Sequence, residues 1–500
     1  MAVPQHYLTV NGLRAQRLTN IVYKAFSQNN PRSFHYTPYK ALWKPLDSGS
    51  RPAMQVFDEI YSLPSMLNAH RKVQCLKIAN SGCTRPRCVA YMMFGSNGTV
   101  LGKGFSHVKG HPIYAFFGNK SKYQRCKPGS NTCFHVAHIP LLPDSAWETI
   151  TAYHDGKPPP ESLITHLRRE LMHKVWVHLL DDNFLYAWNH GIVIKCTNGI
   201  EQRVFPRIKI HSVDYPEKVT MATIQNLGVC LCPRCLAKKG LASKLGTSHN
   251  TLVQVSKRRV ESTKRIKKIQ EAQQLIYDLG HLVQSKQVEA LLQAESYVPT
   301  LNAFLRCLSP RIFKFNIFET FVVDQLHEIK LGVWKSELYA NIRDSLISFF
   351  ARFRSVPTFG STIRMFLDDV ASMGRLAARD FEDILQCCLP VFKGLLPSEC
   401  NAPVQRLLFT FAFWHGLAKL CRHTTETLKI MKKLTAKLGS KLRSFAKLTQ
   451  NMNVCETPDE YTRRKKQQAS AQAVLDVCKD VEGAGACGRV TNTVNRLRRR

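Results

Sequence analysis

The sequence predicts a mixed α/β fold followed by a mostly helical region, and three observations indicate it. Apolar runs of strand length, each closed by turn residues, occur between residues 87 and 142 and again between 191 and 213. Between these groups, leucine or valine recurs at every fourth position from Leu163 to Leu179, which is typical of a helix that buries one face. After residue 228 the apolar spacing becomes mostly helical.

The expected elements follow in chain order. Residues 1–85 mix aromatic residues with proline and serine, so we expect an irregular N-terminal region with one short helix near residues 64–79. The first three strand-like runs lie close together and predict an antiparallel meander, which the helix then separates from the last two runs. The predicted strands occupy residues 87–94, 111–119, 133–142, 191–196 and 204–213.

The remainder of the chain is expected to be helical up to about residue 450. Beyond it the composition turns polar and ends in arginines, which predicts a disordered basic tail over residues 451–500. The expected helices occupy residues 257–283, 337–353, 376–388, 403–421 and 425–449.

The charge balance indicates a polyanionic partner. The 500 residues include 71 Lys and Arg against 36 Asp and Glu, which gives a net charge of +35. A globular chain this basic repels itself unless a polyanion neutralises it, and nucleic acid is the commonest one. An anionic membrane surface is the rival partner, but no apolar window approaches 18 residues, so we expect no segment that spans a bilayer.

The cysteines indicate a reducing compartment. The chain has 17 cysteines scattered along its length, and its first residues lack the apolar run of a secretory signal. We therefore expect reduced thiols in the nucleus or cytosol, with a metal site as an alternative use for some of them.

Two acidic residues occupy positions that suit metal-assisted phosphodiester chemistry. Asp214 follows the predicted strand 204–213, and Glu382 lies on a later predicted helix. Magnesium prefers hard oxygen ligands, and two such ions can activate a water and stabilise a leaving oxygen. The alternative is that Asp214, which precedes Tyr215-Pro216, is only a turn residue.

Several long segments occur in an order that is shared with a known family. They are FHYTPYKALWKP (34–45), HPIYAFFGNKSKYQRCKP (111–128), LRRELMHKVWVHLLDDNFLYAWNHGIVIKC (167–196), RVFPRIKIHSVDYPEKVTMATIQNLGVCLCPRCL (203–236), HEIKLGVWK (327–335), VPTFGSTIRMF (356–366) and LAARDFEDILQCCLPVFKGLLP (376–397). Together they resemble the Plavaka-type DNA transposases, which are cut-and-paste transposable elements related to the CACTA and Kyakuja-Dileera-Zisupton families.

The resemblance implies an RNase H-like core with a triad of acids for DNA transposition. It places the core at residues 86–228, a CxxC loop and helical insertion at 229–370, and a helical completion of the core at 371–450. It further implies that Asp214 is the second catalytic acid and Glu382 the third, with Asp380 as an alternative for the third.

The first acid of such a triad belongs in the turn after strand 87–94, where this chain has Asn97. An amide offers one neutral oxygen where a magnesium pair needs an anionic carboxylate, so the resemblance predicts a catalytically inactive copy that still binds DNA. Asn97-Gly98 also fits a type I′ hairpin turn. The alternatives are an active metal-dependent transposase or nuclease and a non-enzymatic scaffold for nucleic acid, RNA included.

A CxxC motif and the resemblance together predict a zinc site. Cys232 and Cys235 form a CxxC pair, which supplies two of the four ligands that a closed structural zinc site needs. The resemblance adds His327, in Asp324-Gln-Leu-His, as a third ligand. The alternative is a pair of reduced structural cysteines with a buried histidine.

A dense run of cations is expected to contact DNA. It comprises Lys257, Arg258, Arg259, Lys264, Arg265, Lys267 and Lys268. Phosphate contact or nuclear import would explain it, and a solvated helix face is the alternative. The expected partner is duplex DNA at transposon ends and the expected location is the nucleus, whereas the sequence leaves open whether the chain forms a homo-oligomer.

Overall fold

The computed structural model consists of two compact units. One contains Met1–Ile329 and Phe409–Arg443, and the other contains Lys330–Leu408 and Ser444–Arg500. The structure describes residues 12–28, 34–44, 52–76, 83–100, 109–153, 158–308, 315–339, 349–360, 378–395 and 397–450, with a few single residues between them.

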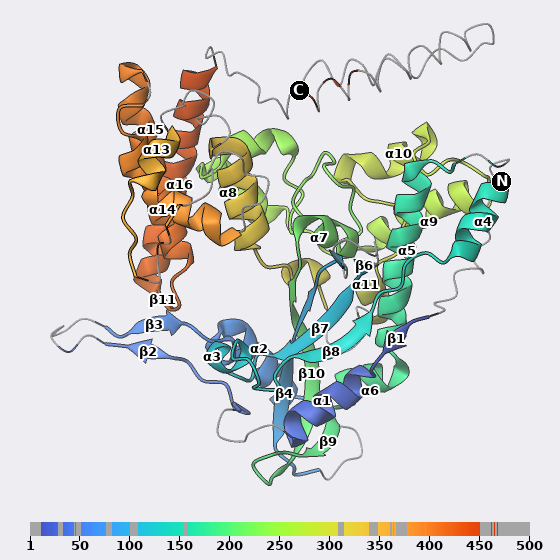
Figure 1. The fold of residues 1–500 in the computed structure, drawn as a ribbon. Helices are drawn as coiled ribbons and strands as arrows, with labels where there is room; N and C mark the ends of the chain where they lie inside the picture. Colours follow the sequence, from blue (N-terminus) through green and yellow to red (C-terminus); the bar gives the residue numbers. More distant parts are fainter. Residues whose placement is uncertain are drawn as a thin grey trace, which may run out of the picture. The chain divides into compact units, whose positions relative to one another are not determined.

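The first unit is built on a six-stranded mixed sheet in the order β1-β8-β7-β4-β10-β9 (Figure 1). Its central strands β4 and β10 are parallel, whereas the other neighbours are antiparallel. The strands are β1 (Arg14–Ala15), β4 (Arg87–Ser96), β7 (Pro112–Phe117), β8 (Phe134–His138), β9 (Ile192–Lys195) and β10 (Glu201–Ser212). The predicted mixed α/β fold and its strand positions are confirmed, and the arrangement is that of an RNase H-like core.

Both faces of this sheet are covered by helices, which explains why its central strands are continuous apolar runs. Along β4, Ala90 and Met92 pack into the core on one face, while Val89 and Tyr91 pack on the other. The larger core lies beneath α1 (Leu18–Ser27), α5 (Glu161–Leu179), α6 (Asp182–His190) and α11 (Ala303–Leu308), and the smaller one beneath α2 (Pro64–Gln74).

The described part of the N-terminal region is more regular than the sequence led us to expect. Helix α1 buries Leu18, Ile21, Val22, Ala25 and Phe26 completely in the main core, and β1 pairs with β8 at the edge of the sheet. The spacing of these five positions is that of a buried helical stripe, so the region completes the core.

The helix predicted at 257–283 is shorter than expected, because only residues 263–277 of this range are helical. Helix α8 (Ser248–Ser256) ends before the run of cations, and α9 (Thr263–Tyr277) begins within it. Ser262 caps α9, because its hydroxyl accepts a hydrogen bond from the backbone N–H of Arg265 at 3.2 Å. The cations before residue 262 therefore lie in a loop.

The other elements of the first unit are shorter. The helices are α3 (Lys122–Arg125), α4 (Asp144–Tyr153), α7 (Tyr215–Met221) and α10 (Lys286–Leu292), with 3-10 turns η3 (Ile60–Ser62), η4 (Lys239–Lys244), η5 (Gln293–Glu295) and η6 (Ile317–Glu319). A π-helical segment η7 (Gln325–Tyr339) begins at its end. Two small sheets contain β2 (Leu42–Trp43), β3 (Met54–Phe57) and β11 (His423–Thr424), and β5 (Thr99–Val100) with β6 (Lys109–Gly110).

The C-terminal helices occur close to where the sequence predicted them. Helices α13 (Phe349–Arg354) and α14 (Ala378–Phe392) belong to the second unit, while α15 (Ser398–Ala418) and α16 (Thr425–Thr449) have residues in both units. Most of the helix predicted at 337–353 and nearly all of the predicted tail lie outside the described residues. In the part of the chain that is described, no helix has the length and apolar character needed to cross a bilayer.

Candidate active site

The register of the two parallel strands brings Asn97 and Asp214 to one edge of the sheet. Gly95 of β4 pairs with Ser212 of β10, so that Asn97 and Asp214 each come two residues after this pair. Because the strands are parallel, both residues leave the sheet at the same end. These are two of the three residues that the sequence assigned to the triad.

Asp214 has a defined structural role at this edge. It is the N-cap of α7, and its Oδ1 accepts a hydrogen bond from the backbone N–H of Glu217 at 2.9 Å. Pro216 occupies one of the first two helical positions, where its lack of an N–H has no cost. The interpretation of Asp214 as the residue that starts a helix is thus confirmed, and its role as a catalytic acid stays a prediction.

Asn97 lies at the exposed end of β4, but not in the predicted hairpin turn. A type I′ turn needs positive φ at both central residues, and neither Asn97 nor Gly98 has it. β4 pairs with β7, and β5, which follows Gly98, pairs with β6. The Asn97-Gly98 link thus leads the chain from one sheet to another, and the hairpin interpretation is wrong.

Glu217 is a second acid at this edge, and the sequence analysis missed it. Its side chain is buried, with 8% exposed, and accepts a hydrogen bond from the hydroxyl of Ser96, the residue before Asn97. Its Oε2 lies 3.1 Å from Nε2 of His111, the residue before β7. The spacing Asp214-x-x-Glu217 could have indicated a helix start, but it gave no signal that the carboxylate reaches across to β4.

The carboxylates at this edge do not make up a complete site for two magnesium ions. Asp214 Oδ1 and both oxygens of Glu217 already contact protein groups. Within the described ranges, no group of three or more His, Cys, Asp or Glu side chains is arranged to hold a metal ion. The expectation of magnesium therefore depends on the resemblance and remains a proposal.

Glu382 belongs to the second unit. It lies on α14, is buried with 8% exposed, and forms an ion pair with Nζ of Lys330 in the same unit. Asp380, the alternative third acid, is half-buried on the first turn of the same helix. The convergence of either acid with Asp214 remains a prediction.

The two cysteines of the CxxC loop contact each other. A side-chain hydrogen bond from Cys235 lowers the pKa of Cys232 to about 6 and raises the pKa of Cys235 above its usual range. A thiolate is the form that binds zinc, so the pair is suited to supply metal ligands. Cys232 lines a cavity of about 300 Å³ with Tyr215, Lys218 and Glu328.

His327 is oriented by a carboxylate. Its Nδ1 lies 2.6 Å from Oδ2 of Asp324, and Asp324 also accepts a hydrogen bond from the His327 backbone N–H at 3.1 Å. Metal-binding histidines commonly have such a partner, which leaves Nε2 available as the ligand. In the described residues His327 is not grouped with the cysteines into a metal site, so zinc remains a proposal.

Two of the seven predicted DNA-binding cations are structural, which corrects that part of the expectation. Arg259 is buried and donates hydrogen bonds to the carbonyls of Cys230, Cys232 and Glu295 at 2.9–3.1 Å, so it holds the CxxC loop in place. Arg265 is buried as well. It donates to the carbonyl of Ala222 at 3.2 Å, and its guanidinium lies 4.8 Å from the centre of the Tyr297 ring. Neither guanidinium faces solvent, so neither is placed to contact a DNA phosphate.

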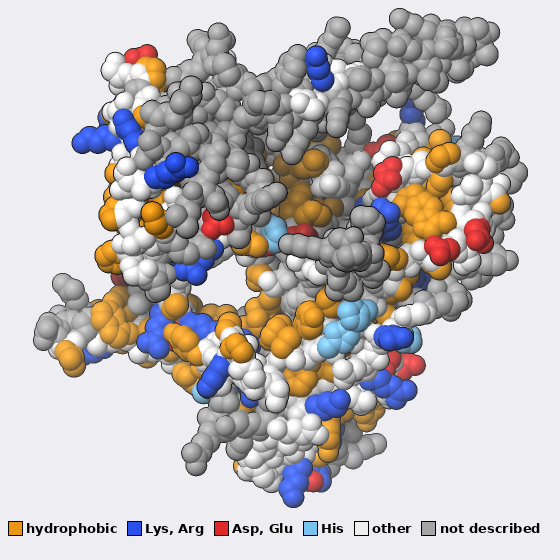
Figure 2. Space-filling view, viewed as in Figure 1, with side chains coloured by type: hydrophobic (Ala, Val, Ile, Leu, Met, Phe, Trp, Pro, Cys, Tyr) orange, Lys and Arg blue, Asp and Glu red, His pale blue; other side chains and the backbone are white. Residues whose placement is uncertain are grey.

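The other five cations of the run differ in how available they are. Lys268 is half-buried and forms an ion pair of 2.5 Å with Glu295. The four that remain are exposed, and they are Lys257, Arg258, Lys264 and Lys267. On the face shown in Figure 2, Lys and Arg side chains occur in several small groups and do not form one continuous patch.

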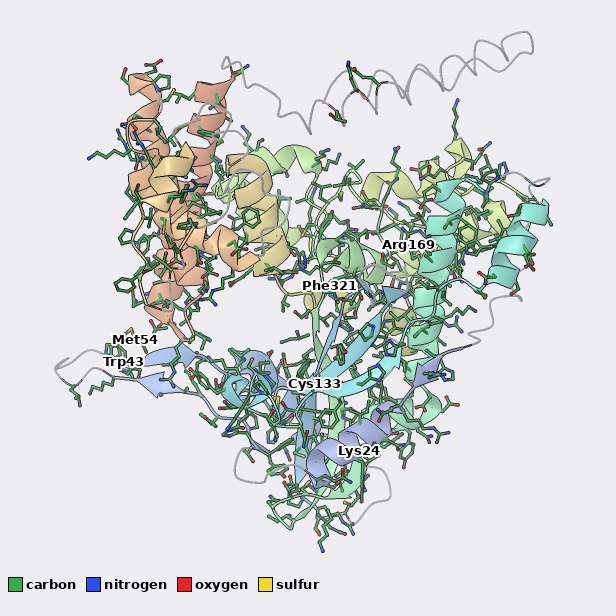
Figure 3. The ribbon with its side chains drawn as sticks, viewed as in Figure 1. Lys24, Trp43, Met54, Cys133, Arg169 and Phe321 are labelled. Carbon is green, nitrogen blue, oxygen red and sulfur yellow. The ribbon has the colours of Figure 1, made fainter. Side chains whose placement is uncertain are left out.

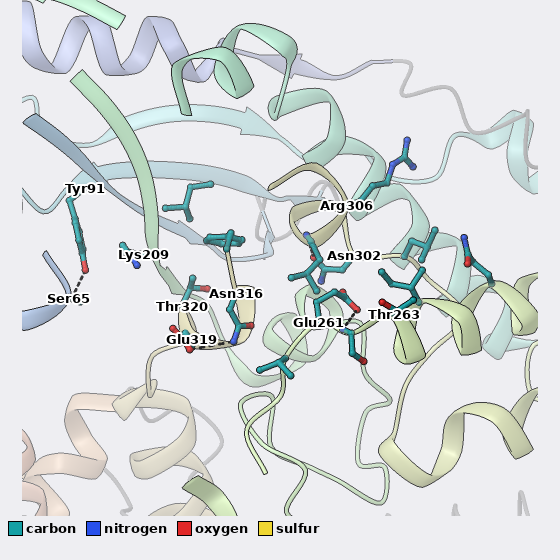
Figure 4. Close-up of a pocket in the computed structure, with 18 residues that line it drawn as sticks. Ser65, Tyr91, Lys209, Glu261, Thr263, Asn302, Arg306, Asn316, Glu319 and Thr320 are labelled. Carbon is teal, nitrogen blue, oxygen red and sulfur yellow. Dashed lines mark hydrogen bonds between the residues drawn. The ribbon is translucent and has the colours of Figure 1, made fainter. Parts of the chain in front are cut away.

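A larger cavity of about 990 Å³ lies elsewhere in the first unit, between β10, the start of α9 and α11 (Figure 4). Side chains of both charges line it, namely Lys209, Glu261, Arg306 and Glu319. Asn97, Asp214 and Glu217 are not among its lining residues. It is therefore separate from the candidate active site.

A parallel strand pair inside an otherwise antiparallel sheet, with Asp214 two residues after the second parallel strand, is the arrangement of an RNase H-like core. The comparison with protein families identifies it further. A family model described as Plavaka transposase matches residues 27–340, well over half of the chain, and the chain therefore belongs to the Plavaka transposase family. No curated protein matches the chain.

Proposed function

We propose that this transposase-derived chain binds duplex DNA but is impaired in cutting it, because Asn97 replaces the first catalytic acid. The observation that supports this most directly is the register of β4 and β10, in which Asn97 is the counterpart of Asp214 on the neighbouring strand. A magnesium pair shares an anionic ligand between its ions, and a neutral amide cannot replace it.

The remaining roles follow from this proposal. Asp214 and Glu382 would be the magnesium ligands, with Asp380 as the alternative to Glu382. The substrate would be DNA at transposon ends, reached in the nucleus. The exposed cations Lys257, Arg258, Lys264 and Lys267 would contact its phosphate backbone. A structural zinc ion would bind Cys232, Cys235 and His327.

One observation favours a second candidate function, an active metal-dependent nuclease or transposase. The Glu217 carboxylate is buried against Ser96, the residue next to Asn97. If this carboxylate turned toward the metal, it would supply the negative charge that Asn97 lacks. The two candidates differ in whether the unmodified chain cuts DNA.

The test is nicking of supercoiled plasmid by the full chain with magnesium. We expect the unmodified protein to bind the plasmid without nicking it above background. Asn97→Asp restores the charge with almost no change in shape, so any nicking that it gains should disappear when Asp214→Ala is added. Robust nicking by the unmodified chain that Asp214→Ala abolishes would overturn the proposal in favour of the second candidate.

A parallel binding experiment addresses the non-enzymatic RNA scaffold. We expect the chain to bind duplex DNA more tightly than single-stranded RNA of equal length at the same salt concentration. Tighter binding to the RNA would contradict the proposed partner. Because this assay needs no cleavage, it is independent of the state of the triad.

A further inference from the structure

Arg169 is a buried cation without a protein partner. It projects from α5 (Figure 3), and only 8% of the residue is exposed. In the described part of the chain its guanidinium forms neither a hydrogen bond nor an ion pair, and its Nε is enclosed without an acceptor. The neighbouring Glu170 contributes a Coulombic attraction but no ion pair.

This arrangement is costly unless something else binds the guanidinium. Burial lowers the pKa of Arg169 to about 10, so the side chain is still charged at neutral pH. Buried charges are normally paired, because removing an ion from water has a large desolvation cost. A cation that the protein leaves unpaired therefore indicates a ligand.

The guanidinium borders a cavity that could admit such a ligand. The cavity has a volume of about 350 Å³ and lies between α5, the loop after α7 and the residues on either side of α10. Because Nε is enclosed, the two terminal nitrogens are the part of the guanidinium that can reach the cavity. The other lining side chains include hydroxyls and amides that can donate hydrogen bonds, namely Ser162, Thr165, Gln225, Asn226 and Gln284.

The acids at the cavity do not neutralise Arg169. Glu161 lies at the rim with an exposed side chain, and its 3.5 Å contact with Arg168 is a surface ion pair that contributes little. Glu289 also lines the cavity, but it is not among the groups that shift the pKa of Arg169. Among the described residues, the cavity thus combines one cation that no hydrogen bond or ion pair holds with several neutral donors, which is the set of groups that an oxyanion requires.

We propose that this cavity binds a phosphate group through Arg169. The planar guanidinium matches two phosphate oxygens at once, and the hydroxyl and amide groups can donate to the others. The phosphate could belong to free phosphate or a nucleotide, or to the backbone of DNA. The cavity is a binding site in addition to the proposed cleavage site, and it needs no catalytic activity.

The test compares two adjacent arginines in the full chain. We measure the melting temperature against inorganic phosphate, with sodium chloride at equal ionic strength as the baseline. The unmodified chain and the control Arg168→Met should show a saturable rise, whereas Arg169→Met should bind phosphate at least tenfold more weakly. Without phosphate, Arg169→Met should melt no lower than the unmodified chain, since it removes a buried charge that has no partner.

A second variant keeps the test valid if Arg169→Met fails to fold. Arg169→Lys retains the charge but loses the planar fork, so it should fold and bind phosphate several-fold more weakly. The proposal is overturned if the unmodified chain shows no saturable rise, or if both Arg169 variants bind phosphate as tightly as it does. Duplex DNA distinguishes the two sources, because Arg169→Met weakens DNA binding more than Arg168→Met only if the phosphate belongs to DNA.

Discussion

The carboxylate of Glu217 accepts a hydrogen bond from the hydroxyl of Ser96, and this contact joins the start of α7 to the end of β4. The same carboxylate contacts His111 at the entry to β7. Three segments that surround the candidate active site are therefore connected through one buried acid.

We predict that Glu217→Gln destabilises the fold and has little effect on cleavage chemistry. Glutamine keeps the shape but loses the charge, and a hydrogen bond to a charged group contributes roughly 1.5–3 kcal/mol. Chemical denaturation should show a loss of that order, while Glu271→Gln, at an exposed position on α9, should change the free energy of unfolding by less than about 0.5 kcal/mol. In an Asn97→Asp background, nicking should stay within about tenfold of the single variant. A loss of a hundredfold or more would instead make Glu217 a metal ligand.

We predict that the purified chain contains zinc that depends on the CxxC loop. Elemental analysis should find about one zinc per chain, and the double substitution Cys232→Ser with Cys235→Ser should remove it. Asp324→Asn should weaken zinc binding by about 10–100-fold, because Asp324 orients His327. Cys75 is exposed in the N-terminal part of the chain, and Cys75→Ser should leave the zinc content unchanged. A chain without zinc, folded and with both thiols reactive, would contradict this prediction.

We predict that four exposed cations, and not the two buried arginines, set the salt dependence of DNA binding. The logarithm of the affinity should fall with the logarithm of salt concentration by about 0.9 per phosphate contacted. Replacing an exposed cation that contacts phosphate with glutamine should reduce the slope by about one. The substitutions are made at Lys257, Arg258, Lys264 and Lys267.

The same replacements on α16 serve as the comparison, at the exposed residues Lys432, Lys433 and Lys437. An unchanged slope after the first set and a reduced slope after this one would move the DNA-binding face to α16. Arg265→Gln should act on stability, because it removes the buried guanidinium that donates to the Ala222 carbonyl and to the Thr223 hydroxyl.

We predict that acid weakens the fold through His173. Burial lowers the pKa of His173 to about 4 from a usual value of 6.5. In the folded chain its Nδ1 accepts a hydrogen bond from the Ala303 backbone N–H at 3.3 Å, and its Nε2 contacts the Thr220 carbonyl at 3.1 Å. This pattern requires the neutral ring with its proton on Nε2, since a proton on Nδ1 would oppose the Ala303 N–H.

The sign of the pH effect follows from which state binds the proton. Between pH 6.5 and about 4 the unfolded chain protonates this histidine and the folded chain does not. The contribution of His173 is therefore present above pH 6.5 and is lost as the pH falls toward 4. Glutamine can donate to Thr220 and accept from Ala303 without titrating, so His173→Gln should flatten this part of the curve. The exposed His178→Gln should leave it unchanged.

The sheet and the helix that packs on it could be predicted because their apolar residues occur in continuous runs or at regular spacing. β4 and β10 are buried on both faces and read as apolar runs, and α5 repeats its apolar face every four residues. Helix α1 has an equally regular stripe from Leu18 to Phe26, but it lies among aromatic and proline-rich segments that suggested irregular structure. In that segment, packing against the core stabilises a helix that the local composition did not indicate.

The only site residues whose positions could be predicted are those that closely follow paired strands. Asn97 and Asp214 follow strands whose pairing is implied by the fold, so their shared edge was foreseeable. No local pattern distinguishes the buried Arg259 from the exposed Arg258 beside it, because a run of charges does not reveal which carbonyls need a donor. Glu217 was missed for a similar reason, since its partners Ser96 and His111 are distant in sequence.

The first unit is discontinuous, and this has a consequence for how the protein is made. Strand β3 obtains its partner β11, and Lys122 its acceptor at the Cys421 carbonyl, only after residues 330–408 have been synthesised. A ribosome adding roughly 5–20 residues per second needs several seconds for that segment. During this delay one edge of β3 stays open to pairing with another chain. A chain that stops before residue 409 would therefore lack β11, and although β2 still pairs with β3 on one side, the other edge of β3 would stay open for good.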